Sequence, residues 1–272
     1  MTDHYAVIGN PITHSKSPLI HAEFAKQTGQ HLDYIAQEIP LDGLEAGLKQ
    51  LQQQGFKGIN VTVPFKEQVW QAVDSKSDHA QRSGAVNTVI FNDDGSLFGD
   101  NTDGIGLCRD LVDNHQIQLN NKRILLLGAG GAARGVIEPL LSYQPSQLVI
   151  ANRTASKATQ LADIYADFGQ IQGSGFDDLS GEFDLIINAT SASLQGEVPP
   201  LPDTILAAQA SCYDMMYSQT DTAFITWAKQ HHAHKAIDGL GMLVEQAAEA
   251  FRIWRGVKPD TQPVIQLLRE NN

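Results

Sequence analysis

The fold is decided by the stretch Arg123-Ile124-Leu125-Leu126-Leu127-Gly128-Ala129-Gly130-Gly131-Ala132-Ala133-Arg134-Gly135. Its unbroken apolar run predicts a strand of a sheet that is buried on both faces. The residues after it match a G-x-G-x-x-A variant of the dinucleotide-binding fingerprint, in which Gly128 allows the tight turn, Gly130 lets backbone N–H groups approach a pyrophosphate, and Ala133 permits close helix–strand packing. Since the next helix would add positive potential at its N-terminus, the stretch predicts a Rossmann-type domain.

The rest of the chain alternates short β-rich runs with amphipathic runs of helix length. Predicted strands are Tyr5–Gly9, Tyr34–Ile39, Gly58–Val63, Val86–Phe91, Arg123–Gly128, Gln147–Ala151, Leu185–Ala189, Ala210–Asp214 and Ala236–Asp238. Predicted helices include Pro18–Thr28, Leu44–Gln54, Ile105–His115, Gly131–Leu141, Ser156–Asp167 and Met242–Trp254. This alternation predicts an α/β fold with mainly parallel sheets.

Two boundaries divide the pattern. The first falls near Asn101–Gly104, where one sheet's pattern ends, and the second falls near Asp238–Gly241, after which the last helices have no strand of their own. We therefore expect two domains. Residues 1–103 plus 239–272 would form an N-terminal α/β domain to which the C-terminal helices return, and residues 104–238 would form the Rossmann-type domain.

The composition of the chain limits the classes of partner that the protein is expected to bind. The formal net charge of −12 argues against a phosphate-backbone partner, no run of about 18 apolar residues is present, and no signal peptide is evident at the start. Cys108 and Cys212 lack metal-ligand spacing, and His231, His232 and His234 have no carboxylate or cysteine partners at ligand spacing in the sequence. We expect a cytoplasmic protein, monomer or homodimer, with no metal, nucleic-acid or membrane partner.

The strand after the fingerprint indicates which dinucleotide binds. NAD-binding domains usually end this strand with an Asp or Glu that takes the ribose 2′-hydroxyl. Here it ends Ile150-Ala151-Asn152-Arg153-Thr154-Ala155-Ser156-Lys157, with no carboxylate. Because Arg153 can fork onto a 2′-phosphate, beside Lys157, the sequence favours NADP.

The first hundred residues carry polar groups at strand ends. In Gly9-Asn10-Pro11-Ile12-Thr13-His14-Ser15-Lys16-Ser17-Pro18, Ser17 is predicted to cap the following helix, which leaves Ser15 free to help hold a carboxylate. In Asn60-Val61-Thr62-Val63-Pro64-Phe65-Lys66, the lysine falls in a helical first turn, where the helix dipole opposes it. That cost suggests a functional role for Lys66.

These segments resemble the shikimate/quinate dehydrogenase family over essentially the whole chain. The matching motifs are G-N-P-I-x-H-S-K-S-P, N-V-T-V-P-F-K, G-A-V-N-T, N-T-D-G, G-A-G-G-A-x-R-G, N-R-T, N-A-T-S, Y-D-M-x-Y and D-G-x-G-M-L-x-x-Q-A. One departure is Ser193, where the family often has glycine, and it puts the local loop geometry in question.

The resemblance implies the site residues. Lys66 would be the catalytic acid/base beside Asp103. The substrate-binding residues would be Ser15 and Ser17 for the carboxylate, and Thr62, Lys66, Asn87, Asp103, Tyr217 and Gln246 around the ring. The NADP-binding residues would be Asp78, Gly128, Ala129, Gly130, Gly131, Ala132, Asn152, Arg153, Thr154, Lys157, Met215 and Gly239.

The resemblance also implies the reaction, the reversible NADPH-dependent reduction of 3-dehydroshikimate to shikimate in aromatic amino-acid biosynthesis. Reduction of a ketone needs a proton donor near the developing alkoxide, and Lys66 meets that need. Whether Lys66 or Asp103 formally carries the proton stays open. The alternatives are a quinate/shikimate dehydrogenase that uses NAD, a non-catalytic shikimate-binding regulatory module, and another NADP enzyme such as a tetrahydrofolate dehydrogenase.

Overall fold

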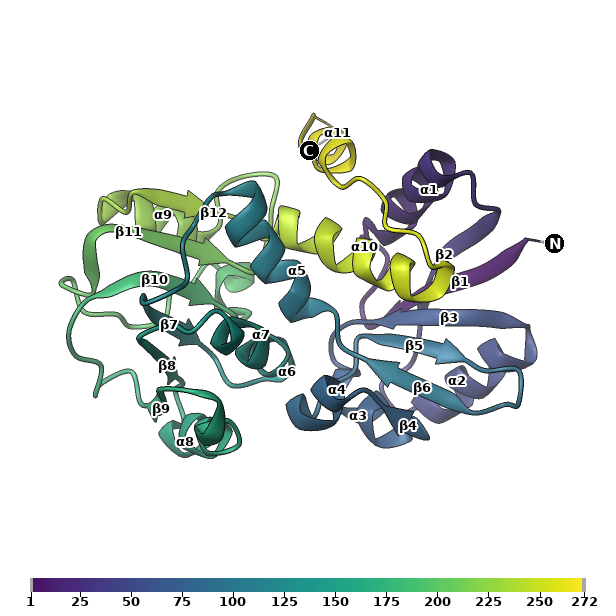
Figure 1. Ribbon diagram of the computed structural model, residues 1–272, viewed down its shortest axis with the longest axis horizontal. Helices are drawn as coiled ribbons and strands as arrows, with labels where there is room; N and C mark the ends of the chain where they lie inside the picture. Colours follow the sequence, from purple (N-terminus) through teal and green to yellow (C-terminus); the bar gives the residue numbers. More distant parts are fainter. Residues whose placement is uncertain (1, 271–272) are drawn as a thin grey trace. The chain divides into compact units, whose positions relative to one another are not determined.

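The computed structural model describes residues 2–270, apart from the side chain of Leu194. The chain divides into two compact units, each with a six-stranded sheet (Figure 1). Unit 1 comprises Met1–Gly106 and Val244–Asn272, and unit 2 comprises Leu107–Leu243. The chain therefore passes from one unit to the other within two helices, α5 (Asp103–Arg109) and α10 (Leu240–Arg255).

The sheet of unit 1 is mixed. Its strands are β1 (Asp3–Gly9), β2 (Leu32–Glu38), β3 (Phe56–Val61), β4 (Ser75–Lys76), β5 (Thr88–Phe91) and β6 (Leu97–Asp100), in the order β2-β1-β3-β5-β6-β4. The pairs β1–β2, β1–β3 and β4–β6 are parallel, whereas β5 is antiparallel to both β3 and β6. Its remaining helices are α1 (Ser17–Thr28), α2 (Leu44–Gln53), α3 (Lys66–Ala72), α4 (Asp78–Ser83) and α11 (Gln262–Glu270).

Apolar clusters lie on both faces of this sheet, and side chains that alternate along β1 enter one cluster or the other. Ala6 and Ile8 of β1 join the apolar cluster that α2 and α3 complete, and Tyr5 and Val7 point to the other face. There Trp254 of α10 donates from Nε1 to the carbonyl of Val89 (3.1 Å). The C-terminal segment is thus part of the core of unit 1.

The sheet of unit 2 is wholly parallel. Its strands are β7 (Arg123–Leu127), β8 (Gln147–Ala151), β9 (Ile171–Ser174), β10 (Phe183–Asn188), β11 (Leu206–Asp214) and β12 (Lys235–Ile237), in the order β12-β11-β10-β7-β8-β9. That order is the doubly wound arrangement of dinucleotide-binding domains, whose ligand site lies where the winding reverses, here between β7 and β10. The predicted α/β class and Rossmann-type domain are confirmed.

Helices pack on both faces of this second sheet. Those that belong to unit 2 are α6 (Gly131–Arg134), α7 (Ile137–Ser142), α8 (Ala155–Asp163) and α9 (Ala223–Gln230). Ile124 and Leu126 of β7 face the cluster that contains α7 and α8, and Leu125 and Leu127 face the cluster that contains α9. All four side chains are fully buried, which explains the continuous apolar run in the sequence.

Three predicted helices are interrupted. The expected helix Gly131–Leu141 is two helices, α6 and α7, with Gly135 between them, where glycine lowers helix propensity. The expected helix Ile105–His115 is α5 followed by a π-helical turn, Asp110–Asn114. The expected helix Ser156–Asp167 ends at Asp163, and a short 3₁₀ turn, Ala166–Phe168, follows. Among the residues that the structure describes, no helix has the length and apolarity needed to span a bilayer.

Candidate active site

Lys66 and Asp103 form a close ion pair in unit 1. Lys66 is the first residue of α3 and Asp103 is the first residue of α5, and Nζ lies 2.6 Å from Oδ2. The side chains are only 16% and 6% exposed, so the pair is not a solvated surface salt bridge. A buried lysine that is opposed by its helix dipole needs a compensating charge, and Asp103 supplies it.

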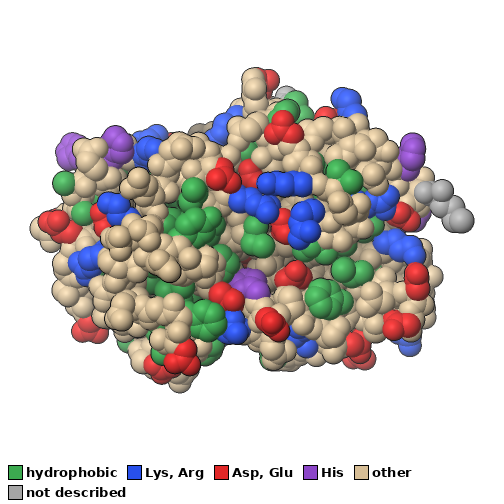
Figure 2. All heavy atoms as spheres, in the orientation of Figure 1, with side chains coloured by type: hydrophobic (Ala, Val, Ile, Leu, Met, Phe, Trp, Pro, Cys, Tyr) green, Lys and Arg blue, Asp and Glu red, His purple; other side chains and the backbone are tan. Residues whose placement is uncertain are grey.

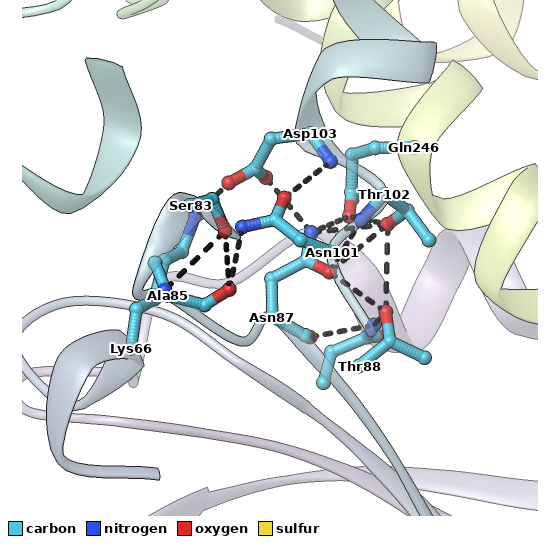
Figure 3. Close-up of polar contacts among 10 residues, drawn as sticks. Lys66, Ser83, Ala85, Asn87, Thr88, Asn101, Thr102, Asp103 and Gln246 are labelled. Carbon is cyan, nitrogen blue, oxygen red and sulfur yellow. Dashed lines mark hydrogen bonds and ion pairs between the residues drawn. The ribbon is translucent and has the colours of Figure 1, made fainter. Parts of the chain in front are cut away.

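Asn87 connects this pair to Gln246. Its Nδ2 donates to Asp103 Oδ1 (2.8 Å) and lies 3.3 Å from Gln246 Oε1 and 3.0 Å from Thr102 Oγ1. Its Oδ1 accepts from the backbone N–H of Thr102 (2.8 Å), and because that group can only donate, the orientation of the amide is fixed. Figure 3 shows Asn87, Asp103 and Gln246 converging, with Gln246 extending from α10.

Asn101 and Thr102 complete the network, and the sequence reasoning did not assign them a role. Asn101 Oδ1 accepts from the backbone N–H of Asp103 (3.1 Å), and its Nδ2 donates to the carbonyl of Ala85 (3.0 Å). Both residues are 1% exposed. The sequence motif Asn101-Thr102-Asp103 could have indicated this role. Asn101 binds the backbone of Asp103, and Thr102 binds Asn87, which in turn binds the Asp103 carboxylate.

The two serines are arranged differently from the prediction. Ser17 does not cap α1, since the N-cap residue is Lys16 and no side chain there accepts a cap hydrogen bond. Instead the Ser15 Oγ accepts from the backbone N–H of Ser17 (3.3 Å), and Ser17 is itself buried. Pro18 occupies the first turn, as predicted. The capping interpretation of Ser17 is wrong because the helix begins one residue earlier than expected.

Thr62 and Asp78 are two further predicted site residues of unit 1. Thr62 follows β3, where its methyl group lies so close to Gly9 that a Cβ on Gly9 would approach within 2.6 Å. Asp78 begins α4, and Ser77 caps that helix by accepting from the N–H of Ala80 (3.1 Å). No hydrogen bond ties either side chain to Lys66 or Asp103 within residues 2–270.

The glycine-rich turn of unit 2 has the geometry that its sequence predicts. Gly128 has φ of +110°, and a Cβ there would lie 3.2 Å from Thr190 Cγ2. Gly130 has open space around it, so a ligand could approach its backbone, and Gly131 begins α6. Ala133 is fully buried against the sheet. Ala129 and Ala132 are partly buried against the same core.

The turn after β8 presents free cationic side chains. Arg153, Thr154 and Lys157 are exposed, and in the described part of the chain no acidic side chain pairs with Arg153 or Lys157. Asn152 Nδ2 donates to the carbonyl of Thr154 (3.0 Å), which shapes the turn, while Thr154 makes no side-chain cap. This arrangement suits a phosphate group, which needs unpaired donors.

Met215 and Gly239 are brought together in unit 2. The N–H of Gly239 donates to the carbonyl of Met216 (3.0 Å), and a Cβ on Gly239 would lie 2.3 Å from the Met215 carbonyl oxygen. Only glycine can pack so closely at this position. Tyr217 follows in the same segment, and burial raises the pKa of its phenol.

Neither histidines nor cysteines form a metal centre in the described residues, where no group of three or more His, Cys, Asp or Glu is suited to hold an ion. His231, just after α9, lies with Nδ1 2.8 Å from the carbonyl of Trp227. Burial raises the pKa of both thiols, Cys108 and Cys212, to about 12, so neither is a ready nucleophile.

Comparison with known proteins decides the family. Residues 7–89 match the family described as shikimate dehydrogenase substrate binding domain, residues 110–195 match shikimate / quinate 5-dehydrogenase, and residues 239–269 match the shikimate 5'-dehydrogenase C-terminal domain. The chain is 55% identical over 269 residues to the shikimate dehydrogenase (NADP(+)) of Alkalilimnicola ehrlichii, covering 99% of each protein. The chain belongs to the shikimate dehydrogenase family. The resemblance predicted from the motifs is confirmed.

Solved structures of related proteins share the fold of this shikimate dehydrogenase family member. An Ael1 enzyme from Pseudomonas putida has a TM-score of 0.92 at 47% identity, with 98% of each chain covered. Shikimate 5-dehydrogenase from Thermus thermophilus, solved in complex with NADP(H) and shikimate, has a TM-score of 0.87 at 33% identity, with 100% of each chain covered.

Proposed function

We propose that this protein is an NADP-dependent shikimate dehydrogenase, which reversibly reduces 3-dehydroshikimate to shikimate in the pathway to chorismate and the aromatic amino acids. The observation that carries the proposal is the partly buried Lys66–Asp103 pair, held by Asn87, in a chain 55% identical to a shikimate dehydrogenase (NADP(+)). An oxidoreductase that acts on a CH–OH group needs a proton donor and acceptor of this kind at its reacting oxygen.

In this proposal the substrate contacts come mainly from unit 1. Ser15 and Ser17 hold the carboxylate, and the ring hydroxyls bind Thr62, Lys66, Asn87, Asp103 and Gln246, with Tyr217 of unit 2 as a further contact. Support comes from the convergence of Asn87, Asp103 and Gln246, whose amide and carboxylate groups can recognise vicinal hydroxyls.

Lys66 delivers the proton to the oxygen of the ketone as negative charge develops there. Its ammonium group, held by Asp103 at 2.6 Å, also stabilises that charge electrostatically. In the reverse direction Lys66 must accept the proton of the alcohol. Asp103 holds the ammonium group in place at 2.6 Å, and we assign it to orienting the substrate.

NADPH, when bound, supplies the hydride. The residues present fit this cofactor: Gly128, Ala129, Gly130, Gly131 and Ala132 would take the pyrophosphate, and Asn152, Arg153, Thr154 and Lys157 would take the 2′-phosphate end. Support comes from the positive φ of Gly128, the open space at Gly130 and the exposed Arg153, which has no acidic partner within the described residues. Met215 and Gly239 would line the nicotinamide pocket, and Asp78 would approach the cofactor.

The proposed functional domains differ by a few residues from the two compact units, which divide after Gly106 and after Leu243. We assign residues 1–103 and 239–272 to a substrate-binding, catalytic domain and residues 104–238 to an NADP-binding domain. We further propose that the protein acts in the cytoplasm, as a monomer or homodimer, with small molecules and not nucleic acid or membranes as partners. In its support, the formal net charge is −12, and Figure 2 shows side chains of both signs on the face drawn, with a group of neighbouring Lys and Arg side chains among them.

The test is oxidation of NADPH by the purified protein with 3-dehydroshikimate, followed by loss of NADPH absorbance. We expect rapid oxidation with this substrate, and much slower reduction of NAD with quinate. Faster turnover of quinate with NAD would support the quinate/shikimate alternative. Tight shikimate binding with no turnover would support the regulatory module and refute the enzyme.

A further inference from the structure

Two motif residues of unit 2, Asn188 and Asp214, have no role in the site described above. They are the last residues of the adjacent parallel strands β10 and β11, and they face one another in register. Both side chains have zero exposure. A carboxylate without contact to water is costly unless hydrogen bonds replace its hydration, so its partners indicate what it stabilises.

Asp214 accepts hydrogen bonds from groups around the strand ends, the Ser193 side chain among them. Oδ1 accepts from Asn188 Nδ2 (3.0 Å) and from the backbone N–H of Met216 (3.1 Å), and Oδ2 accepts from the Thr222 hydroxyl (2.6 Å). Burial raises the pKa of Asp214, even though these hydrogen bonds act in the opposite direction. The carboxylate thus joins β10, the turn after β11 and the N-cap residue of α9.

The orientation of Asn188 is fixed as well. Its Oδ1 accepts from the backbone N–H of Thr190 (3.1 Å), which turns Nδ2 toward Asp214 and toward the Ser193 hydroxyl (3.1 Å). Ser193 therefore takes part in this cluster. Thr190 in turn lies beside Gly128 of the glycine-rich turn.

The same atoms position the backbone that we assign to the nicotinamide pocket. The N–H of Met215 donates to the carbonyl of Asn188 (2.9 Å), and the carbonyl of Met216 accepts from the N–H of Gly239 (3.0 Å). Asp214 holds the N–H between these two bonds, that of Met216. The short segment 215–216 is thus fixed from both sides, with Gly239 packed onto the Met215 carbonyl.

We propose that Asp214 is a positioning residue for the nicotinamide end of the cofactor. It acts through Met215, Met216 and Gly239, and it does not touch the reacting atoms. This inference rests on the proposed function, because it takes Met215 and Gly239 as the nicotinamide-lining residues. The adenosine end, at Arg153 and Lys157, lies on another strand end of the sheet and does not depend on Asp214.

The experiment compares binding of NADP⁺ with binding of adenosine 2′,5′-bisphosphate, which lacks the nicotinamide, by calorimetry on the full chain. In Asp214→Asn the Thr222 hydroxyl must accept from the new N–H instead of donating to Oδ2, and the charge-assisted hydrogen bonds to the carboxylate are lost. We expect roughly tenfold weaker NADP⁺ binding and unchanged binding of the bisphosphate. Misplaced nicotinamide should lower kcat about 100-fold and increase the isotope effect with 4-deuterated NADPH.

A second pair of variants, at Thr222, keeps the test informative if Asp214→Asn does not fold. Thr222→Val removes the hydroxyl that donates to Oδ2, whereas Thr222→Ser retains it, so Val should weaken NADP⁺ binding selectively and Ser should restore it. The matched control is Asp184→Asn at the start of β10, where the carboxylate accepts from the N–H of Arg123 (2.9 Å) and from Lys122 Nζ (2.9 Å). Asp184→Asn should lower thermal stability, but it should not weaken binding of NADP⁺ more than binding of the bisphosphate.

The possible outcomes separate the two proposals. Equal loss of NADP⁺ and bisphosphate binding in Asp214→Asn and Thr222→Val, or no loss of either, overturns the positioning role. The same selective loss in Asp184→Asn overturns it too, since any weakened sheet would then suffice. If wild-type protein does not oxidise NADPH with 3-dehydroshikimate yet binds NADP⁺, the proposed function fails independently of these variants.

Discussion

Lys66 and Arg153 are both cations that we assign to ligand binding, but their surroundings differ. Lys66 is 16% exposed and is already paired with Asp103, which is itself hydrogen-bonded through Asn87. Arg153 is exposed and has no acidic partner among the described residues. The difference follows from their tasks. A proton-transfer group must be held in one geometry before substrate arrives, whereas a phosphate-binding arginine must keep its donors unpaired.

The largest effect should come from substituting Lys66, the cation that is already paired. Lys66→Ala should lower kcat by about 10²- to 10⁴-fold, because the proton donor is lost, while NADP⁺ affinity stays close to wild type. Steady-state kinetics and calorimetry measure the two quantities. Lys66→Arg is the matched variant, since it keeps the positive charge but cannot release its proton. Near-normal turnover in either variant would contradict proton transfer by Lys66.

The next largest effect should come from substituting Arg153, the exposed cation. Arg153→Ala should weaken NADP⁺ binding by about 1.5–3 kcal/mol, the usual contribution of hydrogen bonds to charged groups, and leave NAD⁺ binding unchanged. Competition binding with both cofactors provides the measurement. Lys157→Ala should cause a smaller loss of the same kind. Equal losses for NADP⁺ and NAD⁺ would mean that Arg153 does not bind the 2′-phosphate.

Burial in unit 1 should also make the protein sensitive to acid. His21 is 1% exposed and stacks on Tyr34 with ring centroids 4.1 Å apart. Burial lowers the pKa of His21 from 6.5 to about 3. Below pH 6.5 the unfolded chain binds a proton that the folded chain does not, so stability falls as pH decreases. Near pH 5 the loss should be about 2 kcal/mol, measured by denaturant unfolding.

The control for this pH dependence is a pair of substitutions. His21→Phe preserves an aromatic ring for the stack and should flatten the decline of stability between pH 6.5 and pH 5. His234→Asn, at an exposed position of unit 2, should leave it unchanged. An undiminished acid slope in His21→Phe would assign the effect to other groups.

The smallest effect should come from the serines. Ser15→Ala or Ser17→Ala should raise the KM for shikimate a few-fold with little change in kcat, because a carboxylate away from the reacting carbon is held equally in ground and transition states. Ser142→Ala, at an exposed position of unit 2, should change neither. A fall in kcat at constant KM would show that the serines do not serve mainly to bind substrate.

Sequence patterns predicted the parts of the fold that are governed by burial. The run Ile124–Leu127 indicated a two-sided parallel strand because each of its side chains enters one of two cores. The short strands β4, β6 and β9 were not predicted individually, since they lack apolar runs. In β9, Gly173 lies under α8, where a Cβ would approach Thr159 N within 2.2 Å. That requirement arises from tertiary packing.

The sequence predicted which residues belong to the candidate site, but it did not predict the hydrogen bonds between them. Motifs pointed to Lys66, Asp103, Asn87 and Gln246, and the structure links all four by hydrogen bonds. They did not reveal that Asn101 and Thr102 orient the network, because such roles depend on the direction of amide groups. The helix start at Ser17 was misjudged by one residue, since a Ser-Pro pair suits either the N-cap or the first turn.

The return of the C-terminal segment to unit 1 has a consequence for synthesis on the ribosome. The first 106 residues emerge early, yet the face of their sheet that contains Tyr5, Val7 and Tyr34 packs against Trp254, which is synthesised near the end of the chain. Unit 2 is one continuous stretch and can fold as soon as it leaves the exit tunnel. We therefore expect unit 2 to fold first. The N-terminal sheet stays incompletely covered until the C-terminal helices have been synthesised.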